Sequence, residues 1–269
     1  MDNDDVQVGR LLSRREVLAM MGATGLAILV GCSSNDDAGS TPTARASNTT
    51  ASGATAVASP TQAGVSGEAT TAPACVVRPA LTEGPYFVDE KINRSDIRAN
   101  TSDGAVSDGS TLALIFNVFT VSDGCSPLEG ATVDVWHCDG AGVYSDVDDP
   151  GFSTVGQDFL RGYQLTDASG QAKFLTIYPG WYQGRTVHIH FKIRTDADGQ
   201  SYEFTSQLFF DDTLTDQVYA SEPYAAKGER TLRNDGDGIF QQSGGQLTLV
   251  AAQTSDGYAA TFDIGLQMT

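Results

Sequence analysis

The chain has 269 residues, in which 34 Asp and Glu outnumber 16 Lys and Arg, and its formal net charge is −18 at pH 7. No stripe of basic residues runs along the sequence, so the composition excludes a nucleic-acid-binding protein. Because such a negative charge repels anions at long range, any anionic substrate needs a local positive group to hold it.

The first 32 residues have the pattern of an export signal. Arg14 and Arg15 precede an apolar run from Ala19 to Val30 that is too short to span a membrane as a mature helix. The arginine pair resembles a twin-arginine signal, and LVGC at 29–32 resembles a lipobox whose cysteine, Cys32, becomes lipidated. We therefore predict a twin-arginine lipoprotein signal peptide over 1–32. The protein is then an exported bacterial lipoprotein, held on the extracytoplasmic side of the membrane only through its lipid anchor.

Residues 33–73 consist mainly of Ala, Thr, Ser, Gly and Pro and contain no aromatic residue. A segment of this composition cannot bury enough apolar surface to offset the conformational entropy it loses on folding. We predict a disordered linker over 33–73 and a single folded domain over 74–269.

Short segments with alternating apolar residues, or with many β-branched residues, recur through this domain and are separated by turn sequences such as SDG and DASG. Since no long amphipathic helix interrupts them, they predict an all-β fold, an antiparallel β-sandwich of about eight strands with long loops. The predicted strands cover residues 111–121, 131–137, 161–166, 171–177, 186–193, 203–210, 246–250 and 258–264.

Besides Cys32, the chain contains Cys75, Cys125 and Cys138. A disulfide is expected in an exported protein. Cys125 and Cys138 bracket a single predicted strand and are too far apart to bond to each other. We predict that Cys75 pairs with one of them, and the sequence leaves open which.

Two histidines alternate with apolar residues in the predicted strand VHIHFKIR at 187–194. Successive side chains on a strand point to opposite faces, so His188 and His190 share one face and can chelate one metal ion. The alternative is that they belong to the solvated face of an amphipathic strand.

Tyr144 and Tyr182 lie in glycine-rich loops, one after a predicted strand and one before the histidine strand. Loops on a rigid β scaffold often carry ligands and catalytic groups. A phenolate is a hard donor that only a highly charged cation such as Fe(III) stabilises at neutral pH, so two tyrosines with two histidines favour ferric iron over zinc. The alternative is a pair of ordinary loop aromatics.

Five sequence segments in one order resemble the intradiol ring-cleavage dioxygenases, the family of the protocatechuate and catechol types. They are TEGPY (82–86), DVWHCDGAGVYS (134–145), IYPGWY (177–182), RTVHIHF (185–191) and SQLFF (206–210). The resemblance implies that Tyr144 and His188 are equatorial iron ligands and that Tyr182 and His190 are the axial pair. It also implies that Arg185 and Gln207 line the catalytic site opposite each other.

This resemblance implies a mononuclear non-haem Fe(III) enzyme that cleaves catechol-type rings between the two hydroxyl-bearing carbons, with O₂, to muconate-type diacids. Tyr182 then acts as the base that leaves the metal as substrate arrives, and Arg185 stabilises developing negative charge. We expect Tyr86 and Trp181 to wall the substrate pocket, and the remaining histidine, His137, to have a supporting or structural role.

One departure from the family pattern and two rival interpretations accompany this prediction. Thr186 and Val187 stand where the soluble enzymes usually have Pro and Ala.

A cupin also carries His-x-His on a barrel strand, but the Glu and the further His that it needs do not follow His190 at useful spacing. A non-catalytic extracytoplasmic β-sandwich lipoprotein that binds a partner is the alternative from another class. The sequence leaves the preferred catechol and the oligomeric state open.

Overall fold

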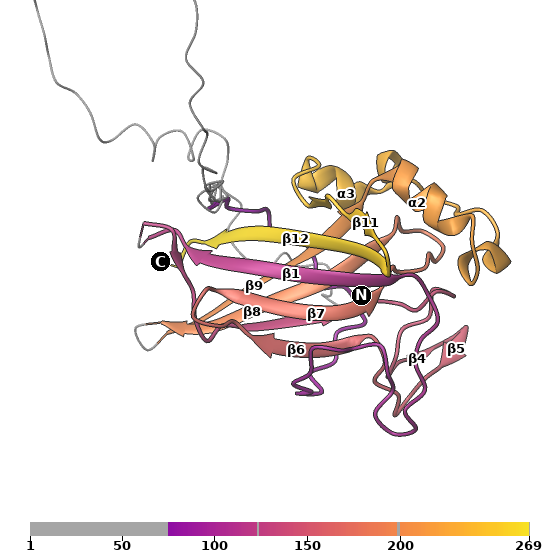
Figure 1. Ribbon diagram of the computed structural model, residues 1–269, viewed down its shortest axis with the longest axis horizontal. Coiled ribbons are helices and arrows are strands. Elements are labelled where there is room, and N and C mark those ends of the chain that lie inside the picture. Colours follow the sequence, from indigo (N-terminus) through magenta and orange to yellow (C-terminus); the bar gives the residue numbers. More distant parts are fainter. Residues whose placement is uncertain (1–74, 123, 198–199, 269) are drawn as a thin grey trace, which may run out of the picture. The chain divides into compact units, whose positions relative to one another are not determined.

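The computed structural model describes residues 75–122, 124–197 and 200–268, and most of their regular structure is strand (Figure 1). One sheet contains β1 (Thr111–Thr120), β2 (Ser126–Pro127), β7 (Gln171–Ile177), β11 (Ala252–Thr254) and β12 (Gly257–Leu266). The other contains β10 (Thr248–Leu249), β9 (Gln200–Phe210), β8 (His188–Ala197), β3 (Thr132–Trp136) and β6 (Arg161–Leu165), in that order. The remaining elements are the hairpin β4 (Asp148–Asp149) and β5 (Phe152–Ser153), the helices α2 (Asp212–Tyr219) and α3 (Gly238–Ser243), and the short 3₁₀ helices η1 (Tyr224–Lys227) and η2 (Asn234–Gly236).

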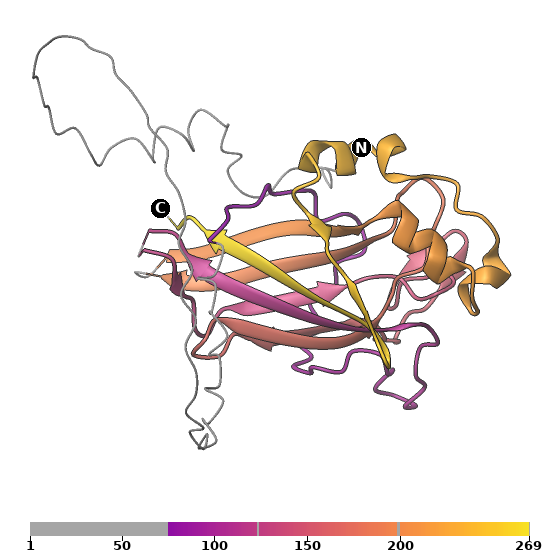
Figure 2. The ribbon, with the colours of Figure 1, turned by 45° about the horizontal axis from the view of Figure 1, so that its top comes forward.

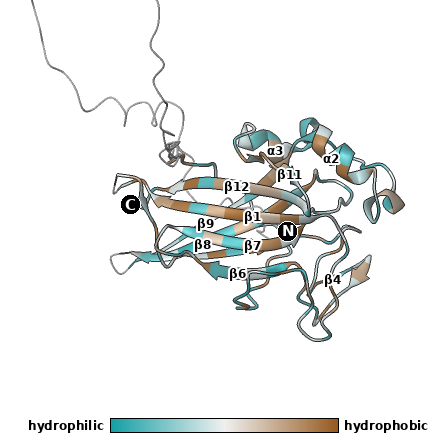
Figure 3. Ribbon diagram, in the orientation of Figure 1, coloured by the Kyte–Doolittle hydropathy of each residue, from teal (hydrophilic) through white to brown (hydrophobic). Residues whose placement is uncertain are grey.

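The two larger sheets pack face to face as two layers (Figure 2). In β1 every second side chain from Leu112 to Val118 is buried, and Figure 3 shows that most of the strand is hydrophobic. These side chains meet the apolar face of β8, where the rings of Phe116 and Phe191 lie 5.2 Å apart. The predicted β-sandwich is therefore confirmed in its layers and its core.

The prediction that all strands pair antiparallel is wrong at two places. β1 pairs in parallel with β12 from Leu112↔Tyr258 to Thr120↔Leu266, and β10 pairs in parallel with β9. Alternation of apolar residues reveals which side chains face the core but carries no information on strand direction. Each parallel pair joins strands that a long stretch of chain separates, as parallel pairing requires; α2 and α3 lie between β9 and β10.

All eight predicted strands are present, although several bounds shift by a few residues. The four additional strands, β2, β4, β5 and β11, contain only two or three residues each and are too short to show a period. The predicted signal peptide, linker and lipidated Cys32 lie outside the described residues. Among the residues that the structure describes, no helix is long and apolar enough to cross a membrane.

The disulfide joins Cys75 to Cys125, with their Cα atoms 5.6 Å apart, and Cys138 is a buried free thiol. This answers the question that the sequence left open. The bond fixes the segment before the first sheet to the turn that follows β1.

Candidate metal centre

His188 and His190 lie side by side at the start of β8 and are almost completely buried. Their Nε2 atoms are 3.0 Å apart, while Ile189 between them points into the core. The ring of His188 is oriented by the Thr186 carbonyl, 2.6 Å from Nδ1. Because a carbonyl can only accept, Nδ1 carries the proton and the lone pair of Nε2 faces the other side chains of the site.

Tyr144 and Tyr182 reach the same point from the two loops in which the sequence placed them. Their hydroxyl oxygens lie 3.3 Å and 3.2 Å from Nε2 of His188. The loops touch closely, since a Cβ atom on Gly142, which has a φ of +82°, would lie 2.1 Å from the Trp181 carbonyl oxygen. Only glycine allows the Tyr144 loop to approach the Tyr182 loop in this way.

We refer to the side chains of Tyr144, Tyr182, His188 and His190 as the donor set. Three of its polar atoms lie 3.0 to 3.3 Å from the fourth, Nε2 of His188. Ligands that share one metal ion through bonds of about 2.0 to 2.1 Å are roughly 2.8 to 3.4 Å apart, depending on the coordination angle. The donor set therefore has the spacing that one metal ion requires, and its two phenol oxygens suit a hard cation such as Fe(III).

Burial controls the protonation of the donor set. It lowers the pKa of His188 to about 3, with a further contribution from the Arg185 charge, and it lowers the pKa of His190 well below its ordinary value. Both imidazoles are consequently neutral at pH 7. Burial raises the pKa values of Tyr144 and Tyr182 well above that of free tyrosine, and the Arg185 charge opposes this rise. A strong cation is needed to make either phenolate stable.

Arg185 and Gln207, which the family resemblance placed opposite each other in one site, contact each other directly. The Arg185 guanidinium donates to Oε1 of Gln207 at 2.6 Å and lies 3.5 Å from Nε2 of His188. Gln207 is buried in β9, beside His190 across the strand pair, and donates to the Thr82 carbonyl at 2.9 Å. The guanidinium thus faces the donor set from a fixed position.

Asp237 is a residue of this site that the sequence did not reveal. Its carboxylate accepts from Nε of Arg185 at 2.9 Å and from the Thr186 backbone N–H at 2.8 Å. It also caps α3 by accepting from the N–H groups of Ile239 and Phe240. In the NDGDG sequence at 234–238, Asp237 stands at the N-cap position directly before α3, a local signal for a helix start that does not indicate a contact with Arg185.

Thr186, which stands where the soluble enzymes of the family usually have proline, takes part in three hydrogen bonds. Its N–H donates to Asp237, its hydroxyl donates to Asn234 at 2.7 Å, and its carbonyl orients His188. A proline at this position lacks the first of these donors. Thr186 therefore ties the approach to β8 to the 234–237 segment.

Tyr86 and Trp181 differ in how they relate to the donor set. The Tyr86 ring stacks on Tyr144, with ring centroids 4.5 Å apart. Trp181 instead donates to the Gly228 carbonyl at 3.3 Å and lies 4.7 Å from Nζ of Lys227. Within the described ranges, a ring contact joins Tyr86 but not Trp181 to the donor set.

His137 is buried and forms two hydrogen bonds away from the donor set. Its Nδ1 lies 2.8 Å from the Cys138 carbonyl and its Nε2 lies 2.7 Å from the Thr176 hydroxyl. These contacts link the end of β3 to β7. The predicted structural role of His137 agrees with them.

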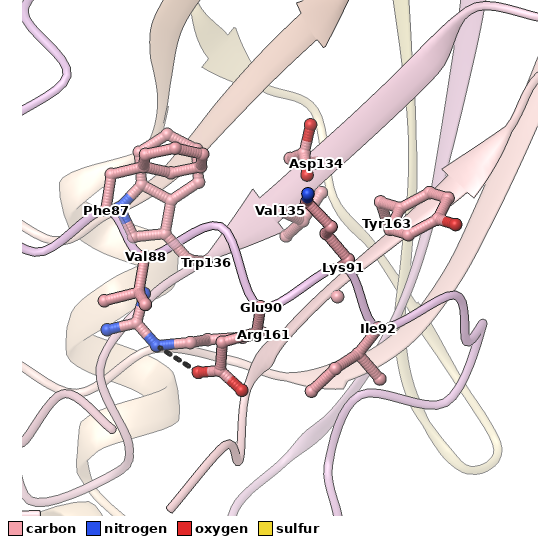
Figure 4. A pocket seen from close by; sticks show the side chains of 11 residues that line it. Phe87, Val88, Glu90, Lys91, Ile92, Asp134, Val135, Trp136, Arg161 and Tyr163 are labelled. Atoms are coloured by element: carbon pink, nitrogen blue, oxygen red, sulfur yellow. Dashed lines mark ion pairs between the residues drawn. The ribbon is translucent and has the colours of Figure 1, made fainter. Parts of the chain in front are cut away.

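Trp136 and Gly84 also enclose the site, and the sequence did not single them out as site residues. The indole of Trp136 stacks on His190 at 5.0 Å and 11°. A Cβ atom on Gly84 would lie 3.2 Å from Cε1 of the same imidazole. Trp136 also lines a small cavity of about 20 Å³. Figure 4 shows the side chains that line it, among them Glu90, which lies 3.7 Å from Nε of Arg161. His190 is therefore held between an aromatic face and a backbone turn.

In the part of the chain that the structure describes, no three His, Cys, Asp or Glu side chains form a group that could hold a metal ion. The candidate centre instead combines two histidines with two tyrosines. A family model described as dioxygenase matches residues 82–268, a range that contains the whole donor set. The chain belongs to the intradiol ring-cleavage dioxygenase family.

Individual members of the family agree with this assignment. An intradiol ring-cleavage dioxygenase from Tetranychus urticae has a similar structure, with a TM-score of 0.62 and 31% identity over 72% of this chain and 95% of that one. A chlorocatechol 1,2-dioxygenase from a Pseudomonas species is 29% identical over 50% of this chain and 55% of its own length. A protocatechuate 3,4-dioxygenase beta chain from Burkholderia cepacia is 31% identical over 46% and 57%. The chain thus spans little more than half the length of these two curated relatives.

Proposed function

We propose that this protein is a non-haem Fe(III) intradiol dioxygenase that cleaves catechol-type rings between the hydroxyl-bearing carbons with O₂, giving muconate-type diacids. The observation that carries the proposal is the convergence of Tyr144, Tyr182, His188 and His190 on one point, at the spacing of metal ligands. The related chlorocatechol and protocatechuate dioxygenases support catechols as the substrate class.

Ferric iron, when bound, draws electron density from a coordinated catecholate and makes a ring carbon susceptible to dioxygen. Tyr144, His188 and His190 are the three buried members of the donor set and would hold the metal through the reaction. Tyr182 is only partly buried and follows a glycine-containing loop, so it is the ligand best able to move. A tyrosine phenolate is a strong base, since the pKa of free tyrosine is about 10, so Tyr182 is suited to accept a proton from a catechol hydroxyl.

Arg185 supplies positive charge beside the reacting ring. Because Asp237 and Gln207 hold its guanidinium, no reorganisation is needed when negative charge develops on a substrate oxygen. Gln207 keeps this arginine in place and is itself fixed by the Thr82 carbonyl. The surrounding buried side chains of Trp136 and Phe209 keep water away from the donor set.

The direct test is to load the purified protein with iron and to supply catechol under ¹⁸O₂. We expect about one ferric iron per chain, a red to burgundy colour from tyrosinate-to-iron charge transfer, and a muconate product with both oxygen atoms of O₂ incorporated. Colourless, iron-free protein after reconstitution would contradict the proposal. Binding of catechol without turnover would instead favour the non-catalytic binding lipoprotein.

We also propose that the protein is exported and anchored outside the cytoplasm by a lipid on Cys32. The support is the arginine pair followed by an apolar run and the LVGC sequence. Replacement of Cys32 with alanine should move the protein from the membrane fraction to the soluble fraction. Membrane association that persists in the variant would indicate an uncleaved hydrophobic anchor.

A further inference from the structure

The substrate-facing side of the candidate site is marked by its partly exposed residues. Tyr182, Tyr86 and Arg185 are partly exposed, whereas the other three donor side chains are buried. A catechol that places its two oxygens at the donor set must therefore enter from this side. Its ring substituents then point back toward the same residues and toward solvent.

Asp149 lies on this side. The Tyr86 ring stacks on Tyr144, and its hydroxyl donates to Oδ2 of Asp149 at 2.8 Å. The Tyr86 ring therefore lies between the Asp149 carboxylate, which it fixes, and the candidate iron ligand Tyr144. Asp149 belongs to the short β4–β5 hairpin, and the same segment carries Asp146 and Asp148.

Among the described residues, the cations near the site already have hydrogen-bond or ion-pair partners. Arg185 pairs with Asp237 and contacts Gln207, and buried Arg161 donates to the backbone carbonyls of Tyr86 and Ser145. The other two cations near the site are also engaged: Lys227 by the carbonyls of Ala141 and Trp181, and Lys192 by Glu83 and Glu203. Arg161 also pairs with Glu90, and within the described ranges Asp149 itself forms no ion pair, so no cation directly compensates its negative charge.

We propose that Asp149 is a specificity-determining residue that selects catechols without an anionic ring substituent. This inference rests on the proposed function and names its substrate class: uncharged or cationic catechols are accepted, and catechols that carry a carboxylate are disfavoured. Two negative charges about 6 to 10 Å apart at a partly solvated site repel each other enough to change a rate by roughly three- to tenfold. The hydrogen bond from Tyr86 holds the Asp149 carboxylate on the side where a carboxylate substituent of a bound catechol would be repelled.

The test compares two substrates that differ only in charge, 3,4-dihydroxybenzoate and its methyl ester, with the iron-loaded full-length protein at pH 7.5. We expect the wild-type protein to cleave the ester with the higher kcat/KM. Asp149→Asn keeps a hydrogen-bond acceptor for Tyr86 and removes the charge. It should raise kcat/KM for the acid by roughly three- to tenfold and leave the value for the ester within about twofold. Added salt should narrow the wild-type preference but have little effect on the variant.

Asp148→Asn is the matched control, because it removes the same charge one residue away on an exposed position of the same hairpin. It should leave the ratio of the two kcat/KM values nearly unchanged. Equal cleavage of acid and ester by the wild-type protein, or equal shifts in the two variants, would overturn the role of Asp149 while the dioxygenase activity stands. If no catechol is cleaved at all, the proposed function fails, and this inference fails with it.

Discussion

At the scale of single residues, the candidate iron ligands can be distinguished from other buried tyrosines. Tyr144→Phe removes one donor oxygen and should abolish most iron binding and the charge-transfer colour. Tyr178→Phe is the matched control, since Tyr178 is equally buried but bonds to the Thr215 hydroxyl outside the site. Iron content and the visible spectrum measure the difference. Retention of normal colour by Tyr144→Phe would show that Tyr144 is not a ligand.

Arg185 should affect turnover rather than metal binding. Arg185→Ala removes the positive charge beside the donor set without removing a donor atom, so the variant should keep its iron and colour. Its turnover should fall by about a hundredfold or more, as is typical when a group that stabilises developing charge is lost. Steady-state kinetics with an iron assay on the same sample measures both properties. Near-normal turnover would refute the role that we assign to Arg185.

The residue scale also shows what a sequence can reveal about a site. Tyr144, Tyr182, His188 and His190 were identified because their residue types and local spacing carry chemical information before folding. Asp237 and Asp149 were missed, since each becomes part of the site only through a contact with a residue far away in the chain, 52 and 63 positions respectively. The local sequence marks Asp237 as a possible helix start, but it shows for neither aspartate that the side chain contacts the site.

At the scale of elements, the carboxylate of Asp237 both caps α3 and binds the Arg185 guanidinium. Burial tends to raise the pKa of Asp237, but the Arg185 charge and hydrogen bonds from Thr186 and Phe240 outweigh it, so the pKa is below its usual value. The ionised form is therefore bound more favourably in the folded state. Its stabilisation is present above the ordinary Asp pKa and is lost as the pH falls through the lower, folded-state pKa.

Asp237→Asn should accordingly lower the free energy of unfolding by about 1 to 3 kcal/mol at pH 7, the range for hydrogen bonds to a charged group. The difference from the wild-type protein should disappear at pH values below the folded-state pKa. Turnover should also fall, because Arg185 loses its ion-pair partner. Exposed Asp235 offers the control: Asp235→Asn should change neither quantity appreciably. Urea unfolding over a series of pH values checks the result, and a pH-independent difference would contradict it.

Alternation of apolar and polar residues could predict some strands of the fold but not others. Strands such as β1 and β8 place one face in the core. Their apolar residues therefore recur at the two-residue period of a strand, and this pattern predicted them. The parallel pairing of β1 with β12 could not be predicted, since it depends on which edge of β1 remains available after the intervening chain has folded. The hairpin β4–β5 is too short to show a period, yet it carries Asp149.

At the scale of the whole molecule, the Cys75–Cys125 bond closes a loop with a sequence separation of 50. In the chain-entropy model a loop of this length stabilises the folded state by about 4 kcal/mol. Replacement of both cysteines by serine should lower the free energy of unfolding by an amount of this order. A reducing agent should destabilise the wild-type protein similarly but leave the double variant unchanged. Equal sensitivity of the two proteins to reduction would show that the bond does not form.

The direction of the strands separates the point where the chain enters the folded domain from the donor set. Val77 bridges to Gly265, and Cys75 bonds to Cys125, so the chain enters the fold near the end of β1. The donor set lies at the opposite end, where β1 and β8 begin (Figure 1). Ten-residue strands are about 30 Å long. A domain attached through the Cys75 end therefore has its donor set about one strand length from the point of attachment, and immobilisation on a membrane or a resin at that end should leave access for substrate open.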